Sequence, residues 1–275
     1  MKLNRILVAL GMVSAAHVNI ARAADAPAAP AAPTPEWTTT GNAVLVSDYL
    51  FRGISQTQHR PTWQVTLEAA HKSGIYFGSF GSGVSNAAYS NGSGSEIDLY
   101  VGWRYTVSEG SSLDLGLVTY WYPGAQYIGT DGKRIPFNTQ EFKAAYNWGT
   151  FNVTGWISPT RTWFGFAYDP LTGERRSTAG SNYLELNWNP ALSDSVTLNL
   201  HAGSQHYRGI SAYNFADAKL GLTWVIDHWS LAAAVTHNTG EVHNNGTPIW
   251  VFFDADGSSK NVAGTRALLS ATYAF

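Results

Sequence analysis

Apolar and polar residues alternate in segment after segment of this chain, and this period of two limits what it can fold into. Successive side chains of a β-strand point to opposite faces, so each segment forms a strand with one apolar face. In residues 96–105, Ile97, Leu99 and Val101 share one face, opposite Glu96 and Asp98. The pattern predicts twelve strands, at residues 44–51, 63–69, 75–84, 96–105, 113–121, 141–148, 151–157, 183–188, 196–205, 216–224, 229–237 and 267–275.

The links between these segments alternate in length. The short links are residues 71–74, 107–110, 149–150, 190–194 and 225–228. The long links are residues 53–61, 85–94, 123–136, 159–180, 207–213 and 239–264. Short periplasmic turns alternating with long extracellular loops are typical of transmembrane barrels, which also have an even number of strands. The sequence therefore predicts an all-β fold, a transmembrane antiparallel β-barrel of about 12 strands.

The C-terminal segment carries the same pattern to the last residue. Its apolar face runs through Ala267, Leu269, Ala271, Tyr273 and Phe275. An alternating strand with a terminal aromatic residue resembles the closing strand of bacterial outer-membrane barrels, where the barrel-assembly machinery recognises this end. Tyr273 and Phe275 are therefore the expected assembly signal. The alternative is an edge strand of a soluble sheet that happens to stop at Phe275.

The N-terminus predicts export. Lys2 and Arg5 precede the mostly apolar residues 6–16. A small-residue site follows, so residues 1–23 form a signal peptide cleaved near Ala23-Ala24. This apolar run is shorter than the roughly 20 residues that a spanning helix needs. An exported chain without a spanning helix can enter the bilayer only as a closed barrel, because lipid leaves backbone polar groups without partners.

The remaining chain divides into a leader and one domain. Residues 24–36 are rich in Ala and Pro and form an extended periplasmic leader, whereas residues 37–275 form the barrel. Charged residues make up 13% of the sequence, about half the roughly 25% of an average globular protein. Without Lys2, Arg5 and Arg22, the exported chain has 14 basic and 19 acidic residues. This balance argues against a nucleic-acid partner, and the absence of Cys excludes a disulfide scaffold.

Aromatic residues with apolar-face parity gather at the ends of the predicted strands. Those at the short-link ends are Trp103, Tyr105, Trp148, Phe151, Trp188, Trp224, Trp229, Tyr273 and Phe275. They would form one girdle at the membrane interface. Tyr49, Phe51, Trp63 and Trp121 lie at the opposite ends and would form the outer girdle.

One motif points to a family. The segment Val46-Ser-Asp-Tyr-Leu-Phe-Arg-Gly-Ile-Ser-Gln56 resembles the signature of the TorF-type (Gcw) outer-membrane porin family. The resemblance continues more weakly through residues 74–82, 96–102 and 113–122. It implies an exported channel of about this length and leaves the solute open.

If the apolar faces meet lipid, the polar faces meet the lumen. The pore-lining candidates are Asp48, Arg52, Glu68, Glu96, Asp98, Arg104, Asp114, Glu141, Lys143, Glu185, His201, Asp217, Lys219 and Arg266. These groups need water or partners inside the barrel. They can form a charged constriction that selects solutes, or a salt-bridged plug that fills the lumen. Asp48 and Arg52, four residues apart on the first strand, are expected to meet at the rim or constriction, or to fix loop geometry as an ion pair.

These observations predict a channel for passive diffusion of small hydrophilic solutes. Eight candidate carboxylates against five permanent cations give the lumen a weak preference for cations. The alternative is a closed barrel that acts as a structural or adhesin-like protein through its long loops. Expected partners are outer-membrane lipids, the assembly machinery and the solutes, and the sequence leaves the oligomeric state open.

Signals for catalysis and cofactors are weak. His228 and Ser230 have the His-x-Ser spacing of outer-membrane phospholipases, but they fall at a short, periplasmic link. Residues 254–257 begin like a calcium loop, without the Glu expected at its twelfth position. We therefore expect no enzymatic activity, no cofactor and no metal site.

Overall fold

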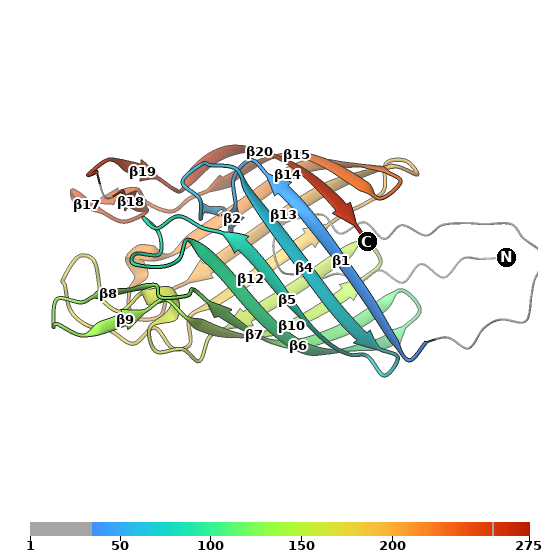
Figure 1. The fold of residues 1–275 in the computed structure, drawn as a ribbon, viewed down its shortest axis with the longest axis horizontal. Coiled ribbons are helices and arrows are strands. Elements are labelled where there is room, and N and C mark those ends of the chain that lie inside the picture. The colour runs from blue at the N-terminus through green and yellow to red at the C-terminus, as the bar shows by residue number, and fades with distance from the viewer. Residues whose placement is uncertain (1–34, 255) are drawn as a thin grey trace, which may run out of the picture.

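The computed structural model describes residues 35–254 and 256–275, which form a closed antiparallel β-barrel (Figure 1). Its strands are β1 (Trp37–Val46), β4 (Thr62–His71), β5 (Ile75–Gly83), β6 (Ser95–Ser108), β7 (Ser111–Trp121), β10 (Thr139–Trp148), β11 (Phe151–Ile157), β12 (Asn182–Trp188), β13 (Val196–His206), β14 (Phe215–Ile226), β15 (Trp229–Asn238) and β20 (Gly264–Ala274). Each strand pairs with its neighbour in sequence, and β1 pairs with β20 to close the ring. The predicted fold and the count of twelve barrel strands are confirmed.

The remaining elements are short and lie in the long loops, gathered at one end of the barrel (Figure 1). They are β2 (Leu50–Phe51), β3 (Ile54–Ser55), β8 (Gln126–Ile128), β9 (Arg134–Pro136), η1 (Trp163–Gly165), η2 (Ser211–Tyr213), β16 (His243–Asn244), β17 (Thr247–Pro248), β18 (Val251–Phe253) and β19 (Ser259–Asn261). The described residues include no helix with the length and apolar character needed to cross a membrane. The expected signal peptide and residues 24–34 of the leader lie outside the described residues.

The first strand was predicted wrongly. It was expected at residues 44–51, whereas β1 begins at Trp37 and ends at Val46. Its early part pairs with β4, where Trp37 lies opposite His71 and Thr40 opposite Glu68. The chain leaves the barrel wall after Val46, so the apolar residues that follow continue a strand pattern without continuing the strand.

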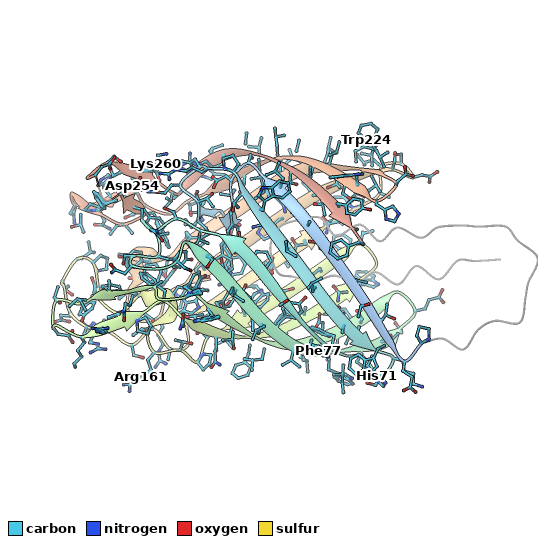
Figure 2. All side chains as sticks on the ribbon, viewed as in Figure 1. His71, Phe77, Arg161, Trp224, Asp254 and Lys260 are labelled. Atoms are coloured by element: carbon cyan, nitrogen blue, oxygen red, sulfur yellow. The ribbon has the colours of Figure 1, made fainter. Side chains whose placement is uncertain are left out.

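The outer surface of the barrel is apolar. Phe77, Leu99, Leu220 and Trp224 are half or more exposed, and Figure 2 shows Phe77 and Trp224 pointing away from the barrel. All nine aromatic residues expected at the short-turn ends are exposed, from 38% for Tyr273 to 67% for Trp148. Such an apolar band with aromatic ends is the surface that a lipid-spanning barrel presents.

The predicted outer girdle is only half right. Trp63 and Trp121 are exposed as expected, at 65% and 49%. Tyr49 is 2% exposed and Phe51 packs against the buried aromatic residues. Both were misplaced because they follow the end of β1, in a segment that turns inward.

Strand register places ionisable side chains side by side on the inner face. Arg104 on β6 lies opposite Asp114 on β7. Lys219 on β14 lies opposite His201 on β13. A shift of one residue in either pairing would move these charges to the lipid face, so the apolar outer pattern also fixes the inner pairs.

Candidate functional site in the barrel interior

The segment that leaves β1 folds into the barrel mouth as a hairpin. Residues 48–59, here called the inward hairpin, contain β2 and β3, with Arg52 and Gly53 as the two-residue turn. Arg52 has a φ of 51° and Gly53 a φ of 77°. Positive φ at both positions defines the type I′ turn that suits the twist of a tight hairpin.

The tip of the inward hairpin is anchored to strands on several sides of the lumen. The Arg52 guanidinium donates to both carboxylate oxygens of Glu141 on β10, at 3.1 and 2.8 Å, and to Gln205 Oε1 on β13 at 2.8 Å. Asn238 Nδ2 on β15 donates to the Arg52 carbonyl at 2.9 Å. The hairpin therefore crosses the mouth and is held by charge-assisted bonds, which are stronger than neutral ones.

The base of the inward hairpin is held by Asp48. Its Oδ1 accepts hydrogen bonds from Ser55 Oγ at 2.6 Å and Thr57 Oγ1 at 2.9 Å. Its Oδ2 lies 3.0 Å from His59 Nδ1, and His59 Nε2 lies 2.8 Å from the Asn261 carbonyl. Asp48 and Arg52 therefore have separate partners, and neither lies on a strand at the rim. Their expected pairing on the first strand was wrong because that strand ends before them.

A second cluster of charges crosses the barrel between β4, β6, β7 and β10. Arg104 makes two hydrogen bonds to Glu68, at 2.7 and 3.0 Å. Asp114 accepts from Lys143 Nζ at 2.8 Å and from the Tyr76 hydroxyl at 2.6 Å. Each charge here has an opposite partner, as buried ions require.

A third cluster lies on β12, β13 and β14. His201 Nε2 lies 2.9 Å from Asp217 Oδ2, and its Nδ1 lies 3.5 Å from Glu185 Oε2. The Tyr183 hydroxyl donates to Asp217 Oδ1 at 2.8 Å. Lys219 lies across from His201 in the register of the same strands.

Two carboxylates on β6 lack a cation. Glu96 is 1% exposed and accepts from the Tyr122 hydroxyl at 3.0 Å, and Asp98 is 2% exposed. Among the described residues, Glu96 Oε2 and Asp98 Oδ1 have no hydrogen-bond partner. Both carboxyl groups are therefore enclosed by protein without an ion-pair partner among the described residues.

Twelve of the fourteen candidates lie on barrel strands with their polar faces inward, and Asp48 and Arg52 lie on the inward hairpin. Arg266 on β20 donates to the Asn261 and Ala263 carbonyls at 2.7 and 2.9 Å, near the base of that hairpin. Among the interior residues nearer the short turns, Asn147, Asn152, Glu185 and Asn187 are partly buried, whereas Thr223 and Ser230 are buried. The interior is thus tightly filled at the mouth and partly accessible near the short turns of β10, β11 and β12.

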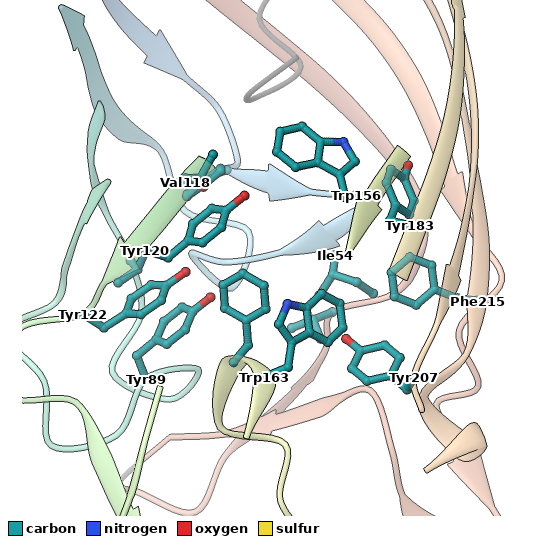
Figure 3. Packing of buried hydrophobic residues seen from close by; sticks show 14 of the residues in the cluster. Ile54, Tyr89, Val118, Tyr120, Tyr122, Trp156, Trp163, Tyr183, Tyr207 and Phe215 are labelled. Carbon is teal, nitrogen blue, oxygen red and sulfur yellow. The ribbon is translucent and has the colours of Figure 1, made fainter. Parts of the chain in front are cut away.

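Above the inward hairpin, the long loops enclose a cavity of about 460 Å³, here called the vestibule. Half of the residues that line it are aromatic, and Arg52 is its one charged side chain among the described residues. Figure 3 shows Tyr89, Tyr120 and Tyr122 on one side of Trp163, and Tyr207 and Phe215 on the other. The sequence patterns gave no sign of this site, because most of its residues come from loops that carry no periodic pattern.

The rim of the vestibule contains a short hydrogen bond between two loops. The Tyr168 hydroxyl donates to Asp131 Oδ1 at 2.5 Å, and Arg175 lies 3.0 Å from Asp131 Oδ2. The Tyr168 hydrogen bond, together with the backbone amide of Lys133 and the nearby cations, lowers the pKa of Asp131 to about 2. The Asp131 carboxylate therefore stays charged and bound to Tyr168 at neutral pH.

The residues with the weak sequence signals for catalysis and metal binding do not come together as a site in the described part of the chain. His228 packs its ring beside Tyr273, whereas Ser230 is buried on the inner face of β15. Within residues 35–254 and 256–275, no group of three or more His, Asp or Glu side chains is placed to hold a metal ion.

Comparison with known proteins gives the family. Residues 29–249 match the model of a family of bacterial proteins of unknown function, Gcw_chp. The chain belongs to this family. The Gcw resemblance expected from residues 46–56 is thereby confirmed, and the TorF-type porin name is not part of the family description. None of the curated proteins compared matches the sequence.

Solved membrane barrels resemble this Gcw_chp chain. The match to a KdgM porin covers 86% of this chain and 99% of the porin chain, at 8% identity and a TM-score of 0.48. The match to a NanC porin also covers 86% of this chain and 99% of the porin chain, at 8% identity and a TM-score of 0.47. The match to outer membrane phospholipase A from Escherichia coli covers 85% of this chain and 89% of the phospholipase chain, at 13% identity and a TM-score of 0.43.

Proposed function

We propose that this protein is an outer-membrane channel for small hydrophilic solutes, with the inward hairpin as its constriction. The observation that carries the proposal is the charged tip of that hairpin, which crosses the mouth while polar residues near the short turns of β10, β11 and β12 remain partly accessible. Fixed charges at a narrow point select solutes by size and sign. The short turns then face the periplasm and the vestibule faces the exterior.

Planar-bilayer recordings test the channel and its constriction together. The wild type should show discrete conductance. The double variant Arg52→Gln/Glu141→Gln removes the anchor without leaving one buried charge alone, which would itself destabilise the fold. We expect a larger unit conductance because the hairpin tip is released. The matched control is Lys72→Gln/Glu36→Gln, which removes an exposed ion pair of 2.7 Å outside the lumen and should leave conductance unchanged.

We further propose that the lumen has a weak preference for cations. Arg52, Arg104 and Lys143 are paired with Glu141, Glu68 and Asp114. The eight candidate carboxylates still exceed the five permanent cations by three, and Glu96 and Asp98 are two of the carboxylates without a cation partner among the described residues. Negative charge in a low-dielectric wall enriches cations, and salt weakens this effect as the Debye length falls to about 10 Å at 0.1 M. Reversal potentials should show cation preference at low salt that fades at high salt.

Two variants separate the sources of this preference. Glu96→Gln/Asp98→Asn should weaken it, whereas Arg104→Gln should strengthen it by leaving Glu68 without its cation. Anion preference in the wild type would contradict the charge assignment.

The second candidate function is a closed barrel that acts as a structural or adhesin-like protein through its loops. The near-complete burial of Arg52, Glu141 and Gln205 at the mouth favours it. Liposome-swelling assays separate the two functions. A correctly folded protein that admits no solute, with or without its Arg52–Glu141 anchor, would support the closed barrel.

A further inference from the structure

The vestibule has the size and lining of a small-molecule site. Ligand pockets have volumes of about 300–1,000 Å³ and combine apolar or aromatic walls with a few fixed polar groups. The vestibule, at about 460 Å³, lies within this range. Its rings are held by packing on one another: Trp163 and Tyr207 have centroids 4.7 Å apart, and Phe166 and Tyr213 have centroids 4.6 Å apart. Flat aromatic surfaces of this kind suit a planar ligand.

The polar groups of the vestibule show what such a ligand must supply. The indole Nε1 atoms of Trp163 and Trp250 are buried and, among the described residues, have no hydrogen-bond partner. Buried Trp N–H groups usually have an acceptor. The amide oxygens of Gln56 and Gln205, in contrast, already accept from Tyr89 and Arg52, at 2.5 and 2.8 Å. Two donors in the vestibule wall are therefore unpaired, whereas these two amide oxygens are occupied, so a ligand with an acceptor fits this wall.

The described lining contains no carboxylate that would repel an anion. Arg52 is the one charged residue among those described as lining the vestibule, and no Asp or Glu lines it. Glu141, which balances Arg52, is outside this lining. A carboxylate is a strong acceptor and would meet no lining carboxylate that repels it.

We propose that the vestibule binds planar aromatic carboxylates, with the rings between its aromatic side chains and the carboxylate toward the indole N–H groups of Trp163 and Trp250. A carbohydrate fits the lining less well, because its many hydroxyl groups would lack polar partners on these walls. This proposal concerns binding at the outer mouth and does not require that the ligand pass the constriction.

Isothermal titration calorimetry on the full-length protein in detergent micelles tests the proposal. The probes are 2-naphthoate, its uncharged analogue 2-naphthamide, and sucrose. We expect saturable binding of 2-naphthoate, binding of 2-naphthamide weaker by about tenfold, which corresponds to about 1.4 kcal/mol, and no binding of sucrose. Equal affinity for naphthoate and naphthamide would overturn the preference for anions. Absence of saturable naphthoate binding would overturn the site.

Two variants locate the binding. Ala88→Trp adds a large side chain to the vestibule lining and should weaken naphthoate binding at least tenfold. Trp163→Phe keeps an aromatic ring but removes one free donor, and should weaken binding by a smaller factor. Ala202→Trp, which adds the same side chain on the exposed face of β13, is the control and should bind like the wild type. Unchanged binding by Ala88→Trp would exclude the vestibule as the site.

A negative result in the binding experiment and a negative result in the conductance experiment can be told apart. Micelle titration detects the site even if the barrel is closed, and bilayer conductance detects the channel even if no aromatic acid binds.

Discussion

At the scale of single residues, the protein uses hydrogen bonds from tyrosine hydroxyls to hold carboxylates in place. Tyr76, Tyr120, Tyr122 and Tyr183 each donate to an interior carboxylate, and Tyr168 does so at the rim. The interior carboxylates could be predicted from the sequence, because the alternation shows which side chains of a strand face the interior. The tyrosine partners could not be predicted, because which rings reach which carboxylates depends on strands and loops far apart in sequence.

Replacing Tyr168 by Phe should raise the pKa of Asp131, because it removes the main cause that lowers this pKa to about 2. The ordinary Asp value is about 3.9. The contribution of Asp131 to stability is therefore complete above about pH 4 and is lost as the pH falls through about 2. The Asp131 pKa of the wild type and of the variant is obtained from the carboxyl carbon chemical shift measured as a function of pH. Tyr146→Phe on the outer surface is the control. An Asp131 pKa that does not move in Tyr168→Phe would mean that the hydrogen bond has no effect.

At the scale of elements, the inward hairpin shows where sequence patterns stop being informative. Residues 47–51 include Tyr49, Leu50 and Phe51, so the apolar pattern placed them in the barrel wall as the end of the first strand. The local signal for the turn is the Arg52-Gly53 pair, where both residues have positive φ. The direction in which the hairpin folds depends on Glu141, Gln205 and Asn238, whose positions become known only after the barrel closes.

Gly53→Ala tests how closely this hairpin fits the wall. A left-handed backbone costs a non-glycine residue about 1–2 kcal/mol, and an added Cβ would lie 3.0 Å from Asp217 Cβ and 3.1 Å from Asn238 Cβ. The matched control is Gly110→Ala, where φ is +78° and no atom lies within 4 Å of the added Cβ. We expect both variants to lower the melting temperature, and Gly53→Ala alone to increase conductance. Equal effects on conductance would show that the packing of Gly53 does not hold the hairpin.

At the scale of the whole molecule, the seam between β1 and β20 completes the barrel. Its register runs from Asn42 opposite Ala274 to Val46 opposite Ser270. Two further hydrogen bonds of 2.9 Å join the backbones of Gly41 and Phe275. An added Cβ at Gly41 would lie 2.5 Å from the Phe275 ring, so this ring lies over the Gly41 backbone. The closing strand was predictable because its pattern is local, whereas β1 was misplaced because its pairing depends on β4 and β20.

Changes at the C-terminus should therefore impair both closure and assembly. Deletion of Phe275 removes the last two seam hydrogen bonds together with the terminal ring. Phe275→Leu keeps these backbone bonds and separates the contribution of the ring. Tyr273→Asp places a charge on the lipid face, at a cost below the ~2–4 kcal/mol of Arg or Lys at the membrane midplane, and Tyr273→Phe is its control. We expect lower outer-membrane levels for the deletion and for Tyr273→Asp, measured by fractionation and by the heat-modifiable mobility of folded barrels. Normal levels of both would show that neither residue acts as an assembly signal, whereas a loss in Phe275→Leu equal to that of the deletion would assign the effect to the ring.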